Sequence, residues 1–478
     1  MSGQYTVVAI TLAYMVCVGF VTLWVRRASN TARGFTEGGR QFPAVLIGFL
    51  VASEFIGTGV SVGTSQAGYN QGISAAWNVF ALAIGFVLFG IFLAAKYKEL
   101  GLNTISGVLA SRYGEPTRIA ASVMTVFALQ IGAASIYASG GAVLAGVLGI
   151  TTNVAIVTVG AVAVAYVSIG GMRSIVYTNI IHALIKYLGV VLAFGFGLTQ
   201  AGGLTGLRDK LPSQMFVWDT VGWPQIGSWF VAGIGSIFAT QHVIQAIHTV
   251  PDSRAAQRAC FYCAGLMVPF GVLAAGVGMI SAAMHPGINS LQAFPAIIVS
   301  MDRFSASIVV AGLAASLFGT IAALSISTAT LLMKDFFDPL MNRGHDDRRS
   351  VIFIRCASLG AGLIPILMAL GSSNILNVAY LSKSLRGTLA ILVLLAFYAP
   401  RFGTASVAFW GVVVSLPATI IWYLMGNPWG VDNAYIAIIT PLLIMGAAQI
   451  WTKENVSITA AVRITAPATA NTIRNGRN

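Results

Sequence analysis

Residues 49–59 read Phe49-Leu50-Val51-Ala52-Ser53-Glu54-Phe55-Ile56-Gly57-Thr58-Gly59. It places a carboxylate, a hydroxyl and two glycines near the middle of an apolar run over 43–62. An ionisable group at mid-membrane costs about 2.5–3.5 kcal/mol, so it marks a function or has a partner. Irregular backbone survives at that depth only where it lines a cavity. We predict a broken membrane helix along a solute pathway, with a nearby cation that neutralises Glu54 as the structural alternative.

The composition indicates that most of the chain lies in a membrane. Of its 478 residues, 57% are hydrophobic and 9% are charged, whereas soluble domains have about 25% charged residues. So few charges cannot cover a water-facing surface, which excludes a soluble enzyme, a nucleic-acid-binding protein and a disordered chain. The apolar runs are long and continuous rather than short and alternating, which excludes an outer-membrane barrel. We expect an all-α, polytopic membrane protein in contact with the lipid bilayer.

The apolar runs predict about 13 transmembrane helices, because a helix needs about 20 apolar residues to cross the hydrocarbon. The runs cover residues 5–26, 43–62, 71–95, 118–147, 153–171, 179–200, 225–249, 257–284, 306–333, 351–371, 374–399, 403–425 and 434–452.

Basic residues are spread unevenly over the loops between these runs. Most of the 27 Lys and Arg lie in alternate loops, whereas the opposite loops hold Arg208, Lys210 and Arg303. Because cytoplasmic loops carry the excess of Lys and Arg, we predict a cell-membrane protein with its amino terminus outside and its carboxyl terminus in the cytoplasm. The net charge of +13 then reflects topology and attraction to the anionic inner leaflet, and does not indicate nucleic acid.

No motif for ATP use or catalysis accompanies the apolar runs. The sequence has no Walker loop, no H-E-x-x-H and no G-x-S-x-G. Cys260 and Cys263 have CxxC spacing, but they begin an apolar run and have no second pair, which favours packing over metal binding. We therefore predict a secondary transporter with no cofactor, not an enzyme. The alternatives are a substrate sensor that does not transport and a channel.

A second polar interruption occurs in the apolar run 225–249. It reads Thr240-Gln241-His242-Val243-Ile244-Gln245. A core histidine held by a neighbour is the ordinary explanation for one such residue, but three large polar side chains at this spacing suggest a polar helix face. Interrupted helices in two halves of a transporter indicate the substrate site. The predicted solute-binding residues are Ser53, Glu54, Gly57, Thr240, Gln241, His242 and Gln245.

Several short motifs, in this order and spacing, resemble the sodium:solute symporter family. They are Arg33-Gly34-Phe35 through Gly38-Gly39-Arg40; Ala52–Gly57 with Gly68-Tyr69 and Gly72; Thr104-Ile105 with Arg112-Tyr113-Gly114; Gly170–Thr178; and Ser327-Thr328-Ala329-Thr330 ahead of Asp335. The resemblance implies a LeuT-like five-plus-five inverted repeat within a transporter domain over 1–455. Its repeats would cover about 43–200 and 225–399, with one leading and two trailing helices. Residues 456–478 would form a polar cytoplasmic tail.

The resemblance also implies a sodium site. Its ligands would be the carbonyls of Ile47 and Leu50 at the break of the first core helix, and Ser316, Gly319 and Thr320 on the eighth. Gly319 has no side-chain oxygen where the family has a hydroxyl. Asn179 stands where the family often has an aspartate on the ion exit route. Both departures remove oxygen or charge, so we predict a degraded sodium site.

A lysine on the fifth core helix offers a reason for these departures. Lys186 follows Asn179 by two turns and lies about 10 Å deeper on the same face. Some proton-coupled LeuT-like transporters have a lysine on this helix, with its ammonium where sodium would lie. We hypothesise that Lys186 replaces sodium, so that coupling is to protons or absent. The alternatives are a lysine that snorkels to the cytoplasmic interface and a sodium-coupled symporter with an altered site.

The sugar-binding pattern of the family is not kept. Ala76 stands where the family has a glutamate, and Thr240 where it has an asparagine, which disfavours sugars. Glu54 would suit an amine, and Lys383 and Arg386 would suit a carboxylate unless they lie in an extracellular loop. We expect import of a small amino acid, amine or carboxylate. The identity of the solute, the stoichiometry and the oligomeric state do not follow from the sequence.

Overall fold

The computed structural model describes residues 9–20 without 12 and 15, 42–169, 172–342, 344, 346–370 and 375–451. Within these ranges the chain forms helices and no strands, which confirms the all-α prediction. Eight helices in the described ranges are long and apolar enough to cross a membrane, or nine if one bent pair counts as a span. Shorter apolar helices accompany them, and the number of about 13 stays a prediction. The motif at 33–40 and the tail 456–478 lie outside the described residues.

The helices of the first half are α3 (Ala44–Phe55), α4 (Thr58–Gln71), η2 (Gly72–Ala76), α5 (Trp77–Phe92), α6 (Ala94–Leu100), α7 (Ile105–Leu148), α8 (Thr152–Ile169), α9 (Met172–Gln200), α10 (Gly203–Lys210) and η3 (Ser213–Phe216). Those of the second half are α11 (Trp223–Phe238), α12 (Gln241–His248), α13 (Ser253–Met284), η4 (Ser290–Gln292), α14 (Ala293–Ser300), α15 (Arg303–Leu332), the π-helix η5 (Met333–Phe337), α16 (Asp338–Met341), α17 (Asp347–Ala369), α18 (Ile375–Tyr398), α19 (Ala405–Leu424), η6 (Pro428–Gly430) and α20 (Asn433–Trp451).

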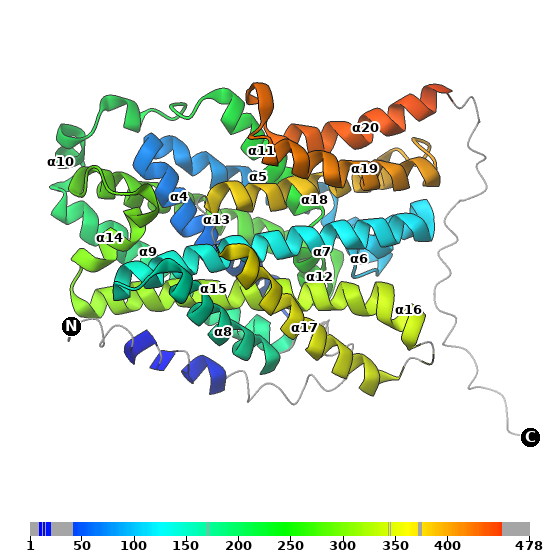
Figure 1. The fold of residues 1–478 in the computed structure, drawn as a ribbon, viewed down its shortest axis with the longest axis horizontal. Coiled ribbons are helices and arrows are strands. Elements are labelled where there is room, and N and C mark those ends of the chain that lie inside the picture. Colours follow the sequence, from blue (N-terminus) through cyan, green and yellow to red (C-terminus); the bar gives the residue numbers. More distant parts are fainter. Residues whose placement is uncertain are drawn as a thin grey trace, which may run out of the picture.

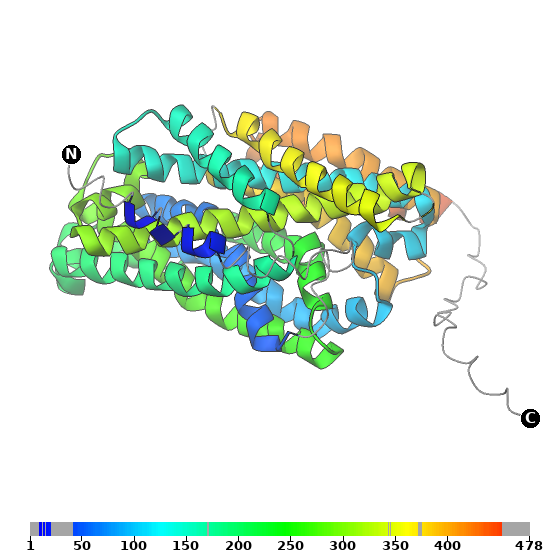
Figure 2. The same ribbon diagram turned by 90° about the horizontal axis from the view of Figure 1, so that it is seen from below.

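The long helices run along the long axis of the molecule and form one bundle (Figures 1 and 2). Helices α10 and α14 lie at one end of this bundle, and α6 and α16 lie at the other (Figure 1). Helix α15 occupies the centre, where it packs against α7, α9 and α17. A membrane whose plane is perpendicular to the long axis would therefore cross the middle of the bundle.

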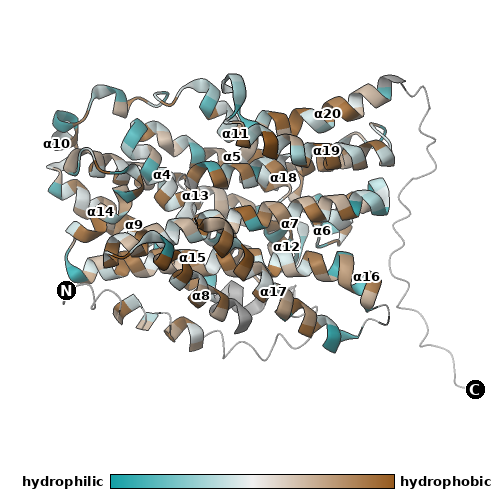
Figure 3. Ribbon diagram, viewed as in Figure 1, coloured by the Kyte–Doolittle hydropathy of each residue, from teal (hydrophilic) through white to brown (hydrophobic). Residues whose placement is uncertain are grey.

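The outer helices expose large apolar side chains rather than polar ones. Leu188 on α9, Leu367 on α17 and Trp410 on α19 are exposed. Figure 3 shows the same apolar colouring along the middle of the outer helices, with hydrophilic segments gathered towards the two ends. Exposed apolar surface of this kind faces lipid in a membrane protein, which agrees with a multi-pass arrangement.

Small residues allow the closest helix contacts. At Gly278 on α13, a Cβ atom would lie 2.1 Å from the carbonyl oxygen of Ser65 on α4. Only glycine fits there, because the two backbones approach without space for a side chain. Close packing through small residues is the usual way in which helices associate within a membrane.

The first core helix is broken where the sequence predicts, but it is longer than predicted. Helix α3 ends at Phe55 and α4 starts at Thr58, so Ile56 and Gly57 form the break. The predicted apolar run ends at residue 62, whereas α4 continues to Gln71. This extension escapes a hydropathy search because α4 packs against α13, η2 and α7 inside the protein and needs no lipid-facing apolar surface.

Candidate functional site

The break between α3 and α4 leaves backbone carbonyls without helical partners, because the last carbonyls of any helix lack an intrahelical donor. Side chains from α9 and α15 supply the missing hydrogen bonds. Ser316 Oγ donates to the carbonyl of Ile56 at 3.0 Å. The hydroxyl of Thr320 has two acceptors for its one hydrogen, the carbonyl of Glu54 at 3.1 Å and that of Ser316 in its own helix at 2.9 Å. Lys186 Nζ donates to the carbonyl of Ser53 and, at 3.0 Å, to its hydroxyl. The break is therefore held by two hydroxyls and one ammonium.

Lys186 lies deep in the protein and not at an interface. Its residue is 4% exposed, and Glu54 at the break is also 4% exposed. The carboxylate of Glu54 interacts electrostatically with Lys186, while Glu54 Oε2 has no hydrogen-bond partner in the part of the chain that the structure describes. The snorkelling alternative is therefore wrong, and the cation near Glu54 that the sequence left open is Lys186.

The two departures from a sodium site lie side by side. A Cβ atom at Gly319 would come within 2.1 Å of Oδ1 of Asn179, so the asparagine fills the space that a larger residue at 319 would need. Asn179 is fully buried, and neither of its amide atoms has a hydrogen-bond partner among the described residues. Gly319 and Asn179 thus form one packing arrangement.

The structure does not bring Ile47 and Leu50 to this cluster through any hydrogen bond. Both are fully buried inside α3, before its last turn. The carbonyls to which Ser316 and Thr320 donate belong to Ile56 and Glu54 instead. The sodium ligand set implied by the resemblance therefore stays a prediction.

A small cavity lies on the other side of the break. Its volume is about 70 Å³, and it is lined by Glu54, Phe55, Gly57, Gly59, Val60, Leu82, Gly132, Ser135, Ile136, His242, Thr320, Leu324, Ala379, Ser382, Lys383 and Arg386. His242 Nδ1 has no hydrogen-bond partner there, and its ring lies 5.2 Å from that of Phe55. The cavity therefore unites Glu54, Gly57 and His242 among the predicted solute-binding residues.

The remaining predicted solute-binding residues bond elsewhere. Ser53 binds Lys186, and Thr240 Oγ1 accepts a hydrogen bond from Arg386 at 3.0 Å. Gln245 Oε1 accepts from Ser327 on α15 at 2.8 Å. Helices α11 and α12 meet at an angle of 45° at Ala239 and Thr240. The polar side chains of α12 therefore do not share one face towards the cavity. Of Gln241, His242 and Gln245, His242 lines it.

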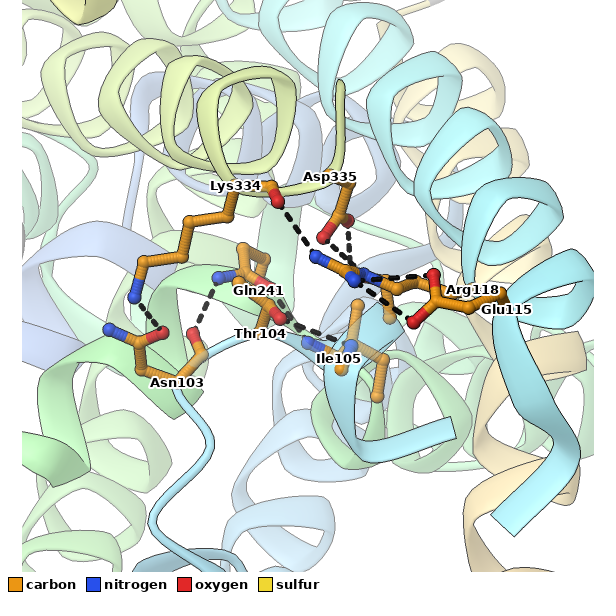
Figure 4. Close-up of polar contacts among 10 residues, drawn as sticks. Asn103, Thr104, Ile105, Glu115, Arg118, Gln241, Lys334 and Asp335 are labelled. Atoms are coloured by element: carbon orange, nitrogen blue, oxygen red, sulfur yellow. Dashed lines mark hydrogen bonds and ion pairs between the residues drawn. The ribbon is translucent and has the colours of Figure 1, made fainter. Parts of the chain in front are cut away.

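Gln241 belongs to a polar network near α6 and α16 (Figure 4). Its amide donates to the carbonyl of Asn103 at 2.8 Å, and its Oε1 accepts from the backbone of Ile105 at 3.0 Å. Lys334 Nζ donates to Oδ1 of the same asparagine at 2.5 Å. The network therefore joins the loop before α7, the first residue of α12 and the π-helix η5.

An ion pair forms the second half of this network. Arg118 Nε on α7 donates to Oδ1 of Asp335 at 2.9 Å, and its NH2 group donates to the carbonyl of Lys334 at 2.7 Å. Ser106 donates to the other carboxylate oxygen. This contact could not be predicted from the sequence, because Arg118 and Asp335 are far apart in the chain and each stands at the end of an apolar run.

A wider polar pocket of about 290 Å³ lies at the ends of α4, α11, α18 and α20 opposite to this network. It is lined by Gly63, Gln66, Ala67, Asn70, Gln71, Gln225, Trp229, Leu376, Asn377, Tyr380, Tyr423, Asn427, Asp432 and Asn433. Tyr380 lies in its wall, and the ring of the same residue lies 4.1 Å from Nζ of Lys383 in the small cavity. Tyr380 therefore stands between the two spaces.

Comparison with known proteins identifies the family. Residues 35–415 match the sequence profile of the sodium:solute symporter family. The chain belongs to this family. Similar relatives are a sodium/glucose cotransporter of Vibrio parahaemolyticus, 23% identical over 96% of this chain and 93% of the relative, and the high-affinity proline transporter PutP of Bacillus subtilis, 24% identical over 85% and 89%.

Solved structures support the same fold. A substrate-bound, outward-open Na⁺-coupled sialic acid symporter superposes with a TM-score of 0.79 over 94% of this chain and 98% of its own, at 18% identity. Mhp1, a nucleobase-cation symporter in a closed conformation, superposes with a TM-score of 0.57 over 89% and 96%, at 15% identity. The LeuT-like fold is confirmed, and the protein is a multi-pass membrane transporter of a cation-coupled family, not an enzyme.

Proposed function

We propose that this family member imports a small polar organic solute, and that Lys186 takes the place of the coupling sodium ion. Transport is then driven by protons or proceeds without a coupling ion. The solute binds in the cavity that Glu54, Gly57, His242 and Thr320 line. Alternating access exposes this cavity first to one side of the membrane and then to the other.

The observation that carries the proposal is the bonding of Lys186 to Ser53 at the break. A helix carboxyl end carries partial negative charge and attracts a cation. Transporters of this type use unwound carbonyls and half-helix carboxyl ends to coordinate sodium. Here the ammonium of Lys186 supplies positive charge at the carboxyl end of α3, and the hydroxyls of Ser316 and Thr320 donate hydrogen bonds to carbonyls at the break.

A positive charge on the chain differs from a sodium ion in one respect: it does not leave with the solute. An ion gradient can drive import only if an ion crosses the membrane during the cycle. Lys186 can contribute such an ion only by releasing and regaining a proton. Glu54, His182, His242, Lys383 and Arg386 interact electrostatically with this buried site or line the adjoining cavity, so they belong to the same charge balance.

Uptake into proteoliposomes tests the proposal. A panel of labelled small amino acids, amines and carboxylates is offered with an imposed proton gradient or an imposed sodium gradient, each in the absence of the other. We expect accumulation with the proton gradient, or equilibration without any gradient, and no dependence on sodium. Lys186→Ala should abolish uptake, whereas Lys96→Ala, at a half-buried lysine of α6 outside the site, should transport as the wild type does.

Two outcomes would replace the proposal. Family membership favours sodium, and strict sodium dependence in the wild type would mean that Ser316, Thr320 and nearby carbonyls still form a sodium site. Binding without transport would instead identify a substrate sensor. Counterflow of labelled solute against unlabelled solute in the liposome separates these cases, because only a transporter exchanges the two.

A further inference from the structure

We infer that Lys383 and Arg386 form an anion subsite, so that the solute is a small organic carboxylate. This inference rests on the proposed function, because it names the chemical class of the solute that the same cavity takes. Both residues lie in α18 and line the cavity beside Glu54. Lys383 is 6% exposed and Arg386 is 7% exposed, which excludes the alternative that they belong to an extracellular loop.

The guanidinium of Arg386 is held in one orientation by neutral groups. Its Nε donates to the carbonyl of Ser382 at 3.1 Å, and its NH2 group donates to the hydroxyl of the same residue at 3.0 Å. Its NH1 group donates to Thr240 at the break between α11 and α12 at 3.0 Å. None of these acceptors carries a charge. These hydrogen bonds therefore fix the position of the Arg386 guanidinium but do not neutralise its charge.

Among the described residues the ammonium of Lys383 has no hydrogen-bond partner. It lies over the face of the Tyr380 ring, 4.1 Å from its centre, and a cation over an aromatic face retains its capacity to donate hydrogen bonds to an anion. A partner of opposite charge favours the charged form of a buried amine, so an anion that enters this cavity would be stabilised beside Lys383. The three donors of Lys383 are available for that anion.

An anion from outside the chain would balance the charge of the cavity. Glu54 is the carboxylate among the cavity-lining residues, and it already interacts with Lys186. Lys383 and Arg386 then remain as two positive charges. Within the described residues neither forms an ion pair with a carboxylate. An incoming carboxylate would accept charge-assisted hydrogen bonds from Lys383 and neutralise one of the two charges. A solute with an amine and no carboxylate would add a third positive charge.

The size of the cavity and its polar groups limit the rest of the solute. The volume of about 70 Å³ suits a molecule of few carbon atoms. Ser135 Oγ donates to the carbonyl of Gly132 and can accept a hydrogen bond from a solute hydroxyl, and Nδ1 of His242, which has no partner among the described residues, can bond to a second polar group. The ring of Phe55 offers an apolar contact. The subsite therefore favours short carboxylates, with or without a second polar group.

Binding to the purified full-length protein tests this inference without requiring transport. The probes are propionate, L-lactate and L-alanine as carboxylates, with propionamide and n-propylamine as matched compounds that lack a carboxylate. We expect each effective carboxylate to raise the unfolding temperature in a saturable manner, and the amide and the amine to have no such effect. A comparison of the stabilisation by L-alanine with that by propionate shows whether the subsite accepts a carboxylate that also has an ammonium group.

Substitutions connect this binding to the subsite. Lys383→Met keeps a long unbranched side chain and removes the charge, and it should weaken carboxylate binding about tenfold or more. Lys96→Met serves as the matched control and should not change the affinity. Arg386→Lys keeps the charge and alters the bonds to Ser382 and Thr240, so it should weaken binding even if Lys383→Met does not fold.

Three results would overturn the inference. They are stabilisation by propylamine or propionamide that equals the effect of the carboxylates, no stabilisation by any of the three carboxylates, and unchanged carboxylate affinity in a folded Lys383→Met protein. Carboxylate binding without counterflow would refute the proposed transport while the subsite stands. Transport of amines alone would refute the subsite while the transporter stands.

Discussion

At the residue scale, Lys186, Ser316 and Thr320 share one task, since each donates a hydrogen bond to a carbonyl at the break of the first core helix. The sequence could indicate Lys186 because a charge inside a membrane helix needs a partner. It could not indicate that Ser53 is the partner, because that contact joins residues 133 positions apart. The carbonyls to which Ser316 and Thr320 donate could not be predicted either, because the family resemblance implies metal ligands and not hydrogen bonds.

Loss of the Thr320 hydroxyl should destabilise the break. Thr320→Val removes a hydroxyl that is shared between the carbonyl of Glu54 and that of Ser316 in its own helix, and loss of the bond to the buried carbonyl of Glu54 should cost about 1–3 kcal/mol. Thr330→Val on the same helix is the control, because Thr330 Oγ1 donates to the carbonyl of Ile326 within its own helix. Thermal unfolding followed by intrinsic fluorescence measures both, and equal losses would show that the break does not depend on Thr320.

The packing of Gly319 against Asn179 leads to a paired prediction. Gly319→Ala should lower stability by about 1–3 kcal/mol, because the new methyl group meets the asparagine oxygen. Adding Asn179→Ala should restore most of the loss. Gly265→Ala is the control, because a Cβ atom there meets nothing within 4 Å. Additive losses in the double variant would contradict direct packing between the two residues.

At the element scale, the two broken helices were predicted more accurately than the faces they present. The break in the first core helix lies within the predicted stretch, and α11 and α12 meet at Ala239 and Thr240 as the polar interruption indicates. The direction of the polar side chains on α12 was not predicted. Gln241 points towards the loop before α7, because that loop supplies both an acceptor and a donor, and a helical periodicity cannot reveal which neighbours each face meets.

The contact between α7 and η5 should contribute measurably to stability. Arg118→Ala leaves the fully buried carboxylate of Asp335 without its cation, and removing one partner of a buried pair costs about 3 kcal/mol. Arg349→Ala is the matched control, because its pair with Asp346 is mostly exposed and such pairs contribute about 0–1 kcal/mol. If the two variants unfold at the same temperature, the pair between α7 and η5 does not stabilise the protein.

At the scale of the whole molecule, the composition was sufficient to predict a membrane protein. The family resemblance was sufficient to predict its fold. Both are confirmed by the helical bundle and by the structural relatives. The extent of α4 was not predictable from hydropathy, because a helix surrounded by protein can be polar along its length. The orientation in the membrane stays a prediction that rests on the distribution of Lys and Arg.

Labelling of single cysteines checks the orientation. In a chain from which the four native cysteines have been removed, Lys210→Cys on α10 and Arg348→Cys on α17 place thiols at exposed positions near opposite ends of the bundle. A membrane-impermeant maleimide added to intact cells should label residue 210 and not residue 348, and permeabilised cells should label both. Labelling of only residue 348 from outside would reverse the predicted topology.

The most direct test of the central claim is whether the purified protein binds sodium. If the Lys186 ammonium takes the place of the ion, radioactive sodium should show no saturable binding that unlabelled sodium displaces, with or without solute. The related proline transporter PutP, which belongs among the matching relatives, is a comparison protein for the assay, and Lys186→Ala tests whether removing the ammonium creates a site. Saturable sodium binding to the wild type would contradict the account.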